Sequence, residues 1–342
     1  MARSRPLVPT LLCTLLFVAS QASSAQEPNA KPLRAGIIGV DTSHAIAFTK
    51  ILNGPKSTAL GVRVVAAFPG GSPDIPSSRD RIEPHTNQLR DVYKLEIVDS
   101  IPALLEKVDV VLLESVDGRP HLEQVRPVFA AKKPVFIDKP AAGSLADGIK
   151  IFDLARETGT PCFSSSSLRY APGVVAAKSD PKVGEIRGAD AYSPCSLDEH
   201  HPDLFWYGIH GVETLYTLMG TGCKSVTRVQ TDDTEFVTGL WDGGRVGTFR
   251  GLRGKAAYGA TIFGSKGVTS CVGSGAYEDL LNEICAFFRT GKAPVSPEET
   301  IELLAFMEAA DESKRQGGKP VTLESVIAKA RAENAQKEKG TK

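Results

Sequence analysis

Apolar runs that alternate with helical segments are the feature that most limits the fold of this chain. The runs lie at 33–40, 62–68, 108–114 and 135–137. They are apolar over most of their length, which is typical of strands buried on both faces of a sheet. Between them lie segments with helical signals, such as Ser144 placed to cap a helix whose Leu145, Ile149 and Phe152 share one face. The pattern predicts an α/β fold, with a Rossmann-like doubly wound parallel sheet over residues 33–165.

Beyond Pro172 the pattern changes, and strands follow one another without intervening helices. The expected strands are 186–192, 225–230, 235–241, 245–252 and 258–263, and the expected helices are 204–219, 277–288, 298–313 and 323–331. Consecutive strands favour antiparallel pairing. We therefore expect residues 166–333 to form an α+β domain with an open, mainly antiparallel sheet. A chain of 342 residues is long enough for these two cores.

The N-terminus has the pattern of a secretory signal over residues 1–25. Arg3 and Arg5 precede an apolar run from Leu7 to Ala19, and small residues end at Ala25. We expect cleavage after Ala25, an exported protein that is periplasmic or secreted, and no stable membrane span in the mature chain.

Charge and cysteine content narrow the class of protein to which the chain can belong. The chain has 40 basic and 40 acidic side chains, so it lacks the basic surplus of a nucleic-acid partner. The five cysteines that follow the leader show no metal-type spacing, and we expect mostly buried thiols.

The first turn after a strand reads Gly36-Ile-Ile-Gly39-Val-Asp41-Thr-Ser-His44. A dinucleotide fingerprint G-x-G-x-x-G that starts at Gly39 has Asp41 as its second position and His44 as its third. Asp41 adds bulk and like charge where the backbone should approach a pyrophosphate. Thr42 and Ser43 could still form an anion site at a helix N-terminus. Two interpretations stay open: a modified phosphate cradle, or a turn that no longer binds the cofactor.

Several motifs together resemble the Gfo/Idh/MocA oxidoreductases, which include glucose-fructose oxidoreductase and inositol dehydrogenase. They are Asp109-Val-Val-Leu-Leu-Glu-Ser115, His121-Leu-Glu-Gln124, Lys133-Pro-Val-Phe-Ile-Asp-Lys-Pro140, Leu168-Arg169-Tyr170-Ala-Pro172, Gly208-Ile-His210-Gly-Val-Glu213 and Ala309-Ala310-Asp-Glu-Ser313. The chain departs from the family pattern at Asp138, where Glu is usual, and at Trp206, where Asp is common. The resemblance also implies a cis peptide between Lys139 and Pro140.

The resemblance implies an exported NAD- or NADP-dependent oxidoreductase that acts on a hydroxyl group of a sugar or polyol. Lys139 and His210 are its implied catalytic residues. The implied cofactor-binding residues are Gly36, Gly39, Asp41, Thr42, Ser43, Ser115, Asp138 and Lys139, and the implied substrate residues are Arg169, Tyr170, His200, His201 and Glu213. We further expect a homo-oligomer that forms through the open sheet.

Other interpretations of these residues stay open. Glu213, three residues after His210, is placed to orient its imidazole, whereas Arg169 and Tyr170 could instead form a salt bridge and a packed ring between domains. Adjacent His200 and His201 do not project to one side of a regular element, so a substrate-facing loop or a surface turn is favoured there over a metal site. At the level of function, the alternatives are a cofactor-poor carbohydrate-binding pseudoenzyme and a glycoside-processing enzyme that uses nicotinamide catalytically.

Overall fold

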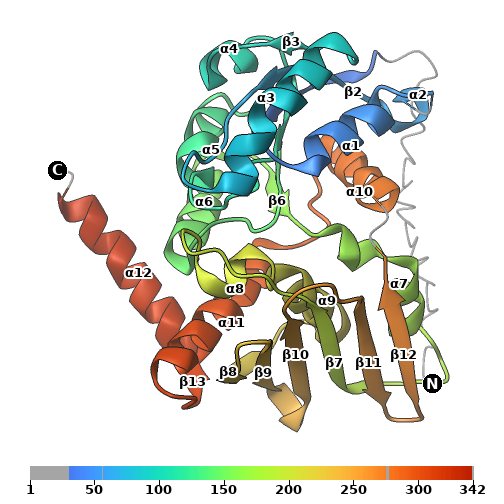
Figure 1. The fold of residues 1–342 in the computed structure, drawn as a ribbon, viewed down its shortest axis with the longest axis vertical. Coiled ribbons are helices and arrows are strands. Elements are labelled where there is room, and N and C mark those ends of the chain that lie inside the picture. Colours follow the sequence, from blue (N-terminus) through green and yellow to red (C-terminus); the bar gives the residue numbers. More distant parts are fainter. Residues whose placement is uncertain (1–30, 56, 275–276, 341–342) are drawn as a thin grey trace, which may run out of the picture. The chain divides into compact units, whose positions relative to one another are not determined.

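The computed structural model describes residues 31–340 apart from 56 and 275–276. The expected signal segment, 1–25, therefore lies outside the described residues. From Pro32 onward the chain forms one compact unit. It contains two sheets, and elements of each are labelled in Figure 1.

The first sheet has six strands in the order β3-β2-β1-β4-β5-β6, and every neighbouring pair is parallel. Its strands are β1 (Leu33–Ile38), β2 (Val62–Phe68), β3 (Glu96–Ile97), β4 (Val110–Leu113), β5 (Val135–Ile137) and β6 (Cys162–Ser164). Its helices are α1 (Ser43–Leu52), α2 (Ser57–Leu60), α3 (Pro76–Asp91), α4 (Ile101–Leu105), α5 (His121–Ala130) and α6 (Leu145–Thr158). This is the strand order of a dinucleotide-binding Rossmann fold.

Apolar side chains on both faces explain why these strands form a central sheet. Neighbours Ile37 and Ile38 in β1 are both fully buried, and they belong to different hydrophobic cores. One core contains Phe48 of α1, and the other contains Phe129 of α5. A parallel sheet covered by helices on both faces is the structure that such continuous apolar runs predict.

The second sheet has seven strands in the order β12-β11-β7-β10-β9-β8-β13. They are β7 (Ile186–Pro194), β8 (Cys223–Gln230), β9 (Thr234–Trp241), β10 (Val246–Leu252), β11 (Tyr258–Gly264), β12 (Val268–Gly273) and β13 (Val321–Thr322). Only β7 and β10 pair in parallel; the other neighbours are antiparallel. The predicted fold class is thus confirmed.

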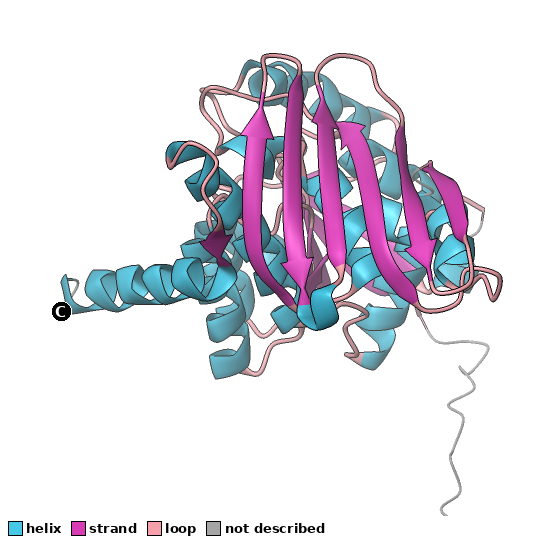
Figure 2. Ribbon diagram, turned by 90° about the horizontal axis from the view of Figure 1, so that it is seen from below, coloured by secondary structure: helices cyan, strands magenta, loops and turns pink. Residues whose placement is uncertain are grey.

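Helices cover one face of this second sheet and leave the other open, as Figure 2 shows. The helices of this half are η1 (Ser167–Tyr170), α7 (Pro172–Lys178), α8 (Asp203–Trp206), α9 (Ile209–Met219), η2 (Asp242–Gly244), α11 (Pro297–Arg315) and α12 (Leu323–Gly340). Buried and solvent-facing residues alternate along β9 and β10, as expected for a sheet with one covered face.

The structure differs from the sequence-based expectation in four places. Helix α10 (Tyr277–Thr290), expected in the second domain, packs its apolar face into the core of the first sheet, because amphipathic spacing does not say which partner covers a face. The sequence predicts a helix only over 87–93, whereas α3 starts at Pro76, since proline is well tolerated in a first helical turn. The helix expected at 204–219 is divided into α8 and α9. The edge strands β12 and β13 were not foreseen.

Two other expectations concern cysteines and membranes. The five cysteines of the described residues are free and buried, as expected. None of the helices in the described part of the chain is both long and apolar enough to cross a bilayer.

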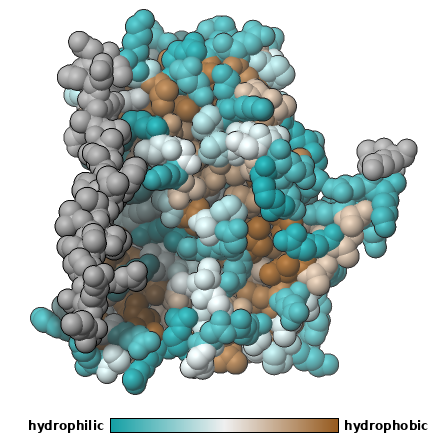
Figure 3. All heavy atoms as spheres, turned by 180° about the vertical axis from the view of Figure 1, so that it is seen from behind, coloured by the Kyte–Doolittle hydropathy of each residue, from teal (hydrophilic) through white to brown (hydrophobic). Residues whose placement is uncertain are grey.

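On the face shown in Figure 3, hydrophilic side chains surround apolar ones that gather over the middle.

Candidate active site

A cavity of about 250 Å³ lies at the carboxyl ends of the parallel strands, where ligands bind in open α/β sheets. It is lined by Thr42, Ser43, His44, Arg81, Val116, Lys139, Ser167, Leu168, Trp206, Tyr207, His210, Tyr258 and Tyr277. The cavity therefore brings together the first turn of α1, the lysine that follows β5 and the histidine of α9. These three segments are far apart in the sequence.

Lys139 follows β5 and is buried, and its peptide bond to Pro140 is cis as expected. Its Nζ lies 3.3 Å from Asp138 Oδ2. Burial opposes the positive charge, but Asp138 outweighs it and raises the pKa of the ammonium. The alternation of an extended strand predicts that neighbours Asp138 and Lys139 point to opposite faces. This prediction is wrong, because β5 ends at Ile137 and the alternation does not continue beyond it.

His210 lies in the first turn of α9, just after the break that separates α8 from α9. Its Nδ1 is 2.9 Å from Ser166 Oγ. Burial, together with the charge on Lys139, lowers the pKa of the imidazole to about 3. From the sequence alone, a histidine at this position is expected to have the ordinary pKa of about 6.5. The structure contradicts this, and His210 is neutral at neutral pH.

Glu213 does not orient His210 directly. Its carboxylate accepts hydrogen bonds from the Ser165 hydroxyl at 2.7 Å and from the Ser166 backbone N–H at 2.8 Å. It also accepts one from Arg169 Nε at 2.9 Å, while Arg169 Nη1 reaches Glu299 at 2.6 Å. Glu213 thus holds Ser166, which in turn contacts His210. Arg169 therefore forms a buried structural ion pair, which was the alternative interpretation to a role in substrate binding.

The remaining expected substrate residues lie outside the cavity lining. Tyr170 packs against the core that includes β1. His200 is exposed and lies 3.4 Å from Glu199. His201 is buried, with its Nδ1 3.1 Å from the Pro202 carbonyl and its ring centroid 5.0 Å from that of Trp206. His201 therefore supports a tryptophan that lines the cavity.

The β1–α1 turn depends on Gly39, which has a φ of +85°. A Cβ at this position would lie 2.5 Å from the backbone nitrogen of Ser115, so both conformation and space require glycine. The Ser115 hydroxyl donates to Gln124 Oε1 at 3.0 Å, and this residue supports the turn rather than the cavity. Gly36 lies inside β1, where a Cβ would meet Leu104 and Val108, so it serves packing.

Of the two side chains that replace fingerprint glycines, His44 lines the cavity, whereas Asp41 does not. Asp41 is fully buried, accepts a hydrogen bond from the Ser78 hydroxyl at 2.6 Å and accepts another from the Val116 N–H at 3.2 Å. Burial raises the pKa of its carboxyl group. Thr42 caps α1 by accepting from the His44 N–H at 3.3 Å, and Ser43 stays exposed at the helix start.

The loop after β2 rests on this turn and on the loop after β4. Ser72 Oγ donates to Asp117 Oδ2 at 2.5 Å, and Arg119 makes two bonds to Asp74 at 2.9 and 3.0 Å. These bonds connect the two loops beside the place where an adenosine ribose binds in this fold. The segment that follows β2 here, Pro69-Gly70-Gly71, offers no ribose-binding acid.

The residues present fit a dinucleotide best at its nicotinamide end. The capped start of α1 with exposed Ser43 offers backbone donors for phosphate, and Lys139 offers a cation at the same cavity. The aromatic rings of Trp206, Tyr207 and Tyr277 supply flat apolar walls of the kind that a nicotinamide ring contacts.

Sequence reasoning missed several residues that line the cavity or position those that do. They are His44, Arg81, Ser166, Tyr207, Tyr258 and Tyr277. Tyr207 had a local signal, since it lies between Trp206 and the Gly-Ile-His segment. Tyr258 and Tyr277 had none, because they come from β11 and α10, which reach the cavity only through the tertiary fold.

Comparison with known families fits this geometry. Residues 33–166 match the model of the family described as "Oxidoreductase family, NAD-binding Rossmann fold". Over these residues the chain is similar to the Gfo/Idh/MocA family, in agreement with the expected resemblance, and the family description names NAD binding. No curated protein sequence matches the chain.

Solved structures share the fold of this chain over most of its length. A probable dehydrogenase from Thermotoga maritima has 20% identity and a TM-score of 0.72, over 86% of this chain and all of that one. A putative myo-inositol dehydrogenase from Sinorhizobium meliloti 1021 has 18% identity and a TM-score of 0.68, over 85% and 99%. A scyllo-inositol dehydrogenase from Lactobacillus casei, solved with NAD(H) and scyllo-inositol, has 14% identity and a TM-score of 0.68, over 86% and 99%. Identities this low establish the fold alone.

Proposed function

We propose that the protein is an exported NAD- or NADP-dependent oxidoreductase that acts on a hydroxyl-bearing carbon of a sugar or polyol. The observation that carries this proposal is the presence of Lys139 and His210 at one cavity beside the first turn of α1. The family match and the inositol dehydrogenases that share the fold support the substrate class.

In this proposal His210 accepts the proton of the substrate hydroxyl. Its Nδ1 is engaged with Ser166, so Nε2 is the nitrogen left for substrate. When Nδ1–H donates to Ser166 Oγ, Nε2 carries the lone pair that takes the proton. Glu213 holds Ser166 through its backbone N–H, and it acts as a positioning residue.

Lys139 has a different part in the same step. Its ammonium donates a hydrogen bond to the substrate oxygen as negative charge develops there. Asp138 keeps the lysine charged and fixes its position at 3.3 Å. A bound nicotinamide supplies the hydride acceptor for the carbinol carbon, and the hydroxyl proton leaves to His210, so the carbonyl product is neutral.

One set of contacts favours a second candidate function, a carbohydrate-binding protein without turnover. The bonds Ser72–Asp117 and Asp74–Arg119 join two loops beside the ribose position, and Asp41 puts a carboxyl group at the second fingerprint position. A protein with these features that keeps the aromatic cavity would still bind a sugar. Mass spectrometry of small molecules that copurify with the protein, followed by turnover assays with NAD and NADP on a panel of polyols, separates the two candidates.

The expected result is a copurifying nicotinamide dinucleotide and hydride transfer with at least one polyol. Sugar binding without nucleotide and without turnover would replace the first candidate by the second. The N-terminal sequence of the mature protein tests the export part separately, since cleavage after Ala25 should yield a chain that begins at Gln26.

The open face of the second sheet suggests a second copy of the chain as partner. Large apolar side chains are exposed on its strands: Val229, Leu240, Val246, Phe263, Val268 and Val272. Apolar patches of this kind mark interaction surfaces on otherwise polar proteins. Sedimentation of the wild type beside a Val246→Lys variant tests this part, and an unchanged monomer in both would contradict it.

A further inference from the structure

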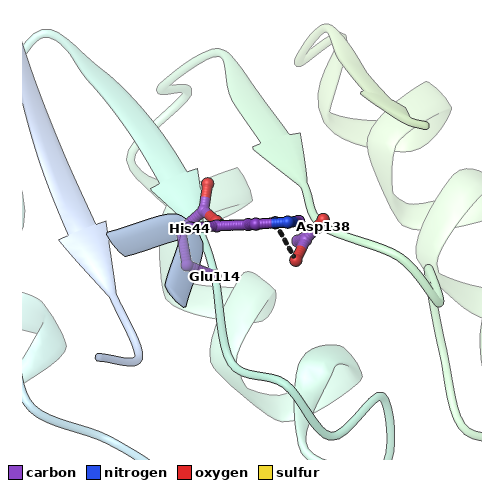
Figure 4. A group of neighbouring side chains, drawn as sticks. All are labelled: His44, Glu114 and Asp138. Carbon is purple, nitrogen blue, oxygen red and sulfur yellow. Dashed lines mark hydrogen bonds and ion pairs between the residues drawn. The ribbon is translucent and has the colours of Figure 1, made fainter. Parts of the chain in front are cut away.

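Behind the cavity wall lies a group of three side chains that the oxidoreductase proposal does not use as a set. His44 comes from the first turn of α1, Glu114 follows β4, and Asp138 follows β5; Figure 4 shows them converging. One ligand atom from each lies within 4.8 Å of the others. Within residues 31–340, gaps aside, this is the group of histidine, cysteine and carboxylate side chains whose geometry suits a metal ion.

Glu114 provides the second observation. It is fully buried, and neither of its carboxylate oxygens has a hydrogen-bond partner. Asp138 Oδ1 is also buried without a hydrogen bond. Buried carboxylate oxygens are almost always hydrogen-bonded or bound to metal, because desolvation without a partner is costly. Three such oxygens in one small region indicate a missing cationic partner.

The distances agree with an ion between these groups. His44 Nδ1 lies 2.8 Å from Asp138 Oδ2 and 3.9 Å from Glu114 Oε2. Metal–ligand bonds of about 2.0 to 2.2 Å place neighbouring ligand atoms about 3.0 to 3.5 Å apart. The two observed distances bracket this range, and all three ligand atoms lie within 4.8 Å of one another, so an ion between them requires the two carboxylates to close around it.

Charge points in the same direction. Glu114 and Asp138 bring two carboxyl groups to this point, and one ammonium, that of Lys139, lies 3.3 Å from Asp138. Two carboxylates beside one ammonium leave negative charge uncompensated. A divalent cation supplies the missing charge. A set of one imidazole and two carboxylates suits ions of borderline hardness.

We propose that His44 Nδ1, Glu114 and Asp138 bind one divalent transition-metal cation, such as Mn²⁺ or Zn²⁺, in the wall behind the cavity. His44 itself lines the cavity, which gives the ion a route from solvent. The ion fixes Asp138, and through Asp138 it fixes Lys139 at the cavity. This assignment does not depend on the oxidoreductase proposal.

The test is a titration of the metal-free full-length mature protein with Mn²⁺ in the absence of nucleotide. Calorimetry and the electron paramagnetic resonance signal of bound Mn²⁺ measure the binding. The wild type should bind one ion per chain. Glu114→Gln, which keeps the shape and removes the charge, should weaken binding by about 100-fold or more. Glu123→Gln, on the exposed surface of α5, is the matched control and should bind like the wild type. Circular dichroism verifies that each variant is folded.

The wild type decides the outcome even if the variant does not fold. Failure of the wild type to bind Mn²⁺ or Zn²⁺, or equal binding by a folded Glu114→Gln, would overturn the proposal and leave a protonated Glu114 as the explanation. Infrared spectroscopy would then detect a protonated carboxyl band that Glu114→Gln abolishes. A protein that binds Mn²⁺ but no nicotinamide contradicts the proposed function alone. A protein that binds nicotinamide but no Mn²⁺ contradicts the metal site alone.

Discussion

The two sides of the cavity differ in how their polar atoms are used. On the lysine side, Asp138 contacts Nζ of Lys139 and Ser166 contacts Nδ1 of His210, and both Lys139 and His210 still line the cavity. On the turn side, formed by residues 39–42, the side chain of Asp41 is bonded to the protein itself. The comparison indicates that the lysine side supplies the reacting groups, whereas the turn side determines the shape of the cavity.

The same comparison explains how each side tolerates departures from the family pattern. The lysine side has Asp138 in place of the usual Glu, yet Asp138 still reaches Lys139 at 3.3 Å because both lie beyond the end of β5. The turn side has exchanged two glycines for Asp41 and His44, and each new side chain has found partners inside the protein. Substitutions on the turn side therefore alter the space open to a phosphate more than the reacting groups.

The largest expected effect comes from removing the ammonium on the lysine side. Lys139→Ala should lower turnover by about 10²-fold or more, because the substrate oxygen loses its cation as charge develops. Steady-state kinetics with the best polyol of the panel provide the measurement. Lys133→Ala removes an ammonium near the other end of β5 and should leave turnover unchanged. Equal activity of both variants would remove the distinction between the two sides.

On the turn side, Gly39→Ala should act on stability. The positive φ and the close contact with Ser115 together should cost about 2 kcal/mol or more of unfolding free energy. Gly159 at the end of α6 has a φ of +68° but open space around it, so Gly159→Ala should cost only about 1 kcal/mol. Urea unfolding measures both, and equal costs would show that the contact with Ser115 is unimportant.

Asp41→Asn sharpens the comparison by changing charge alone. An asparagine can accept from the Val116 N–H with its Oδ1 and donate its Nδ2–H to Ser78 Oγ, so the fold should be unaffected. Loss of the negative charge beside the phosphate position should tighten binding of NAD or NADP by about 3- to 10-fold. Calorimetric titration at two salt concentrations measures this. Weaker binding by a folded variant would mean that the carboxylate itself contacts the cofactor.

The smallest expected effect is a difference in pH dependence. His210 has a pKa of about 3 in the folded chain, below the value of about 6.5 for an unfolded histidine. The unfolded state therefore binds more protons as pH falls, and this contribution to stability is complete above about pH 6.5 and lost toward pH 3. Thermal unfolding of His210→Gln should depend less steeply on pH than the wild type in this window. Exposed His200→Gln should keep the wild-type slope.

Much of the fold could be predicted because it depends on local patterns. The apolar strands of the first sheet and the change near Pro172 determine the two sheets and their pairing class. The position of α10 could not be predicted in this way, since its apolar face fits either core by composition. Edge strand β12 escaped notice because its sequence, Val-Thr-Ser-Cys-Val-Gly, has neither a long apolar run nor clear alternation.

For the site, the sequence located residues at strand ends but not the contacts between distant segments. Lys139 and His210 could be proposed from motifs, and the cavity contains both. The partnership of Ser166 with His210, and that of Glu213 with Arg169, depend on how η1 packs against α9. The low pKa of His210 was missed for the same reason, because burial and the nearby lysine are tertiary effects.

The buried thiols can serve as internal probes of local unfolding in this protein. Burial raises the pKa of Cys162, Cys195, Cys223 and Cys285 to about 12 and also raises that of Cys271. Thiolate is the reactive form, so an alkylating reagent should label each cysteine only when its surroundings open. Cys162 and Cys285 lie in the cores of the first sheet, and the other three belong to the second. The order in which peptides gain the label would therefore tell which half of the molecule opens first, without any engineered probe.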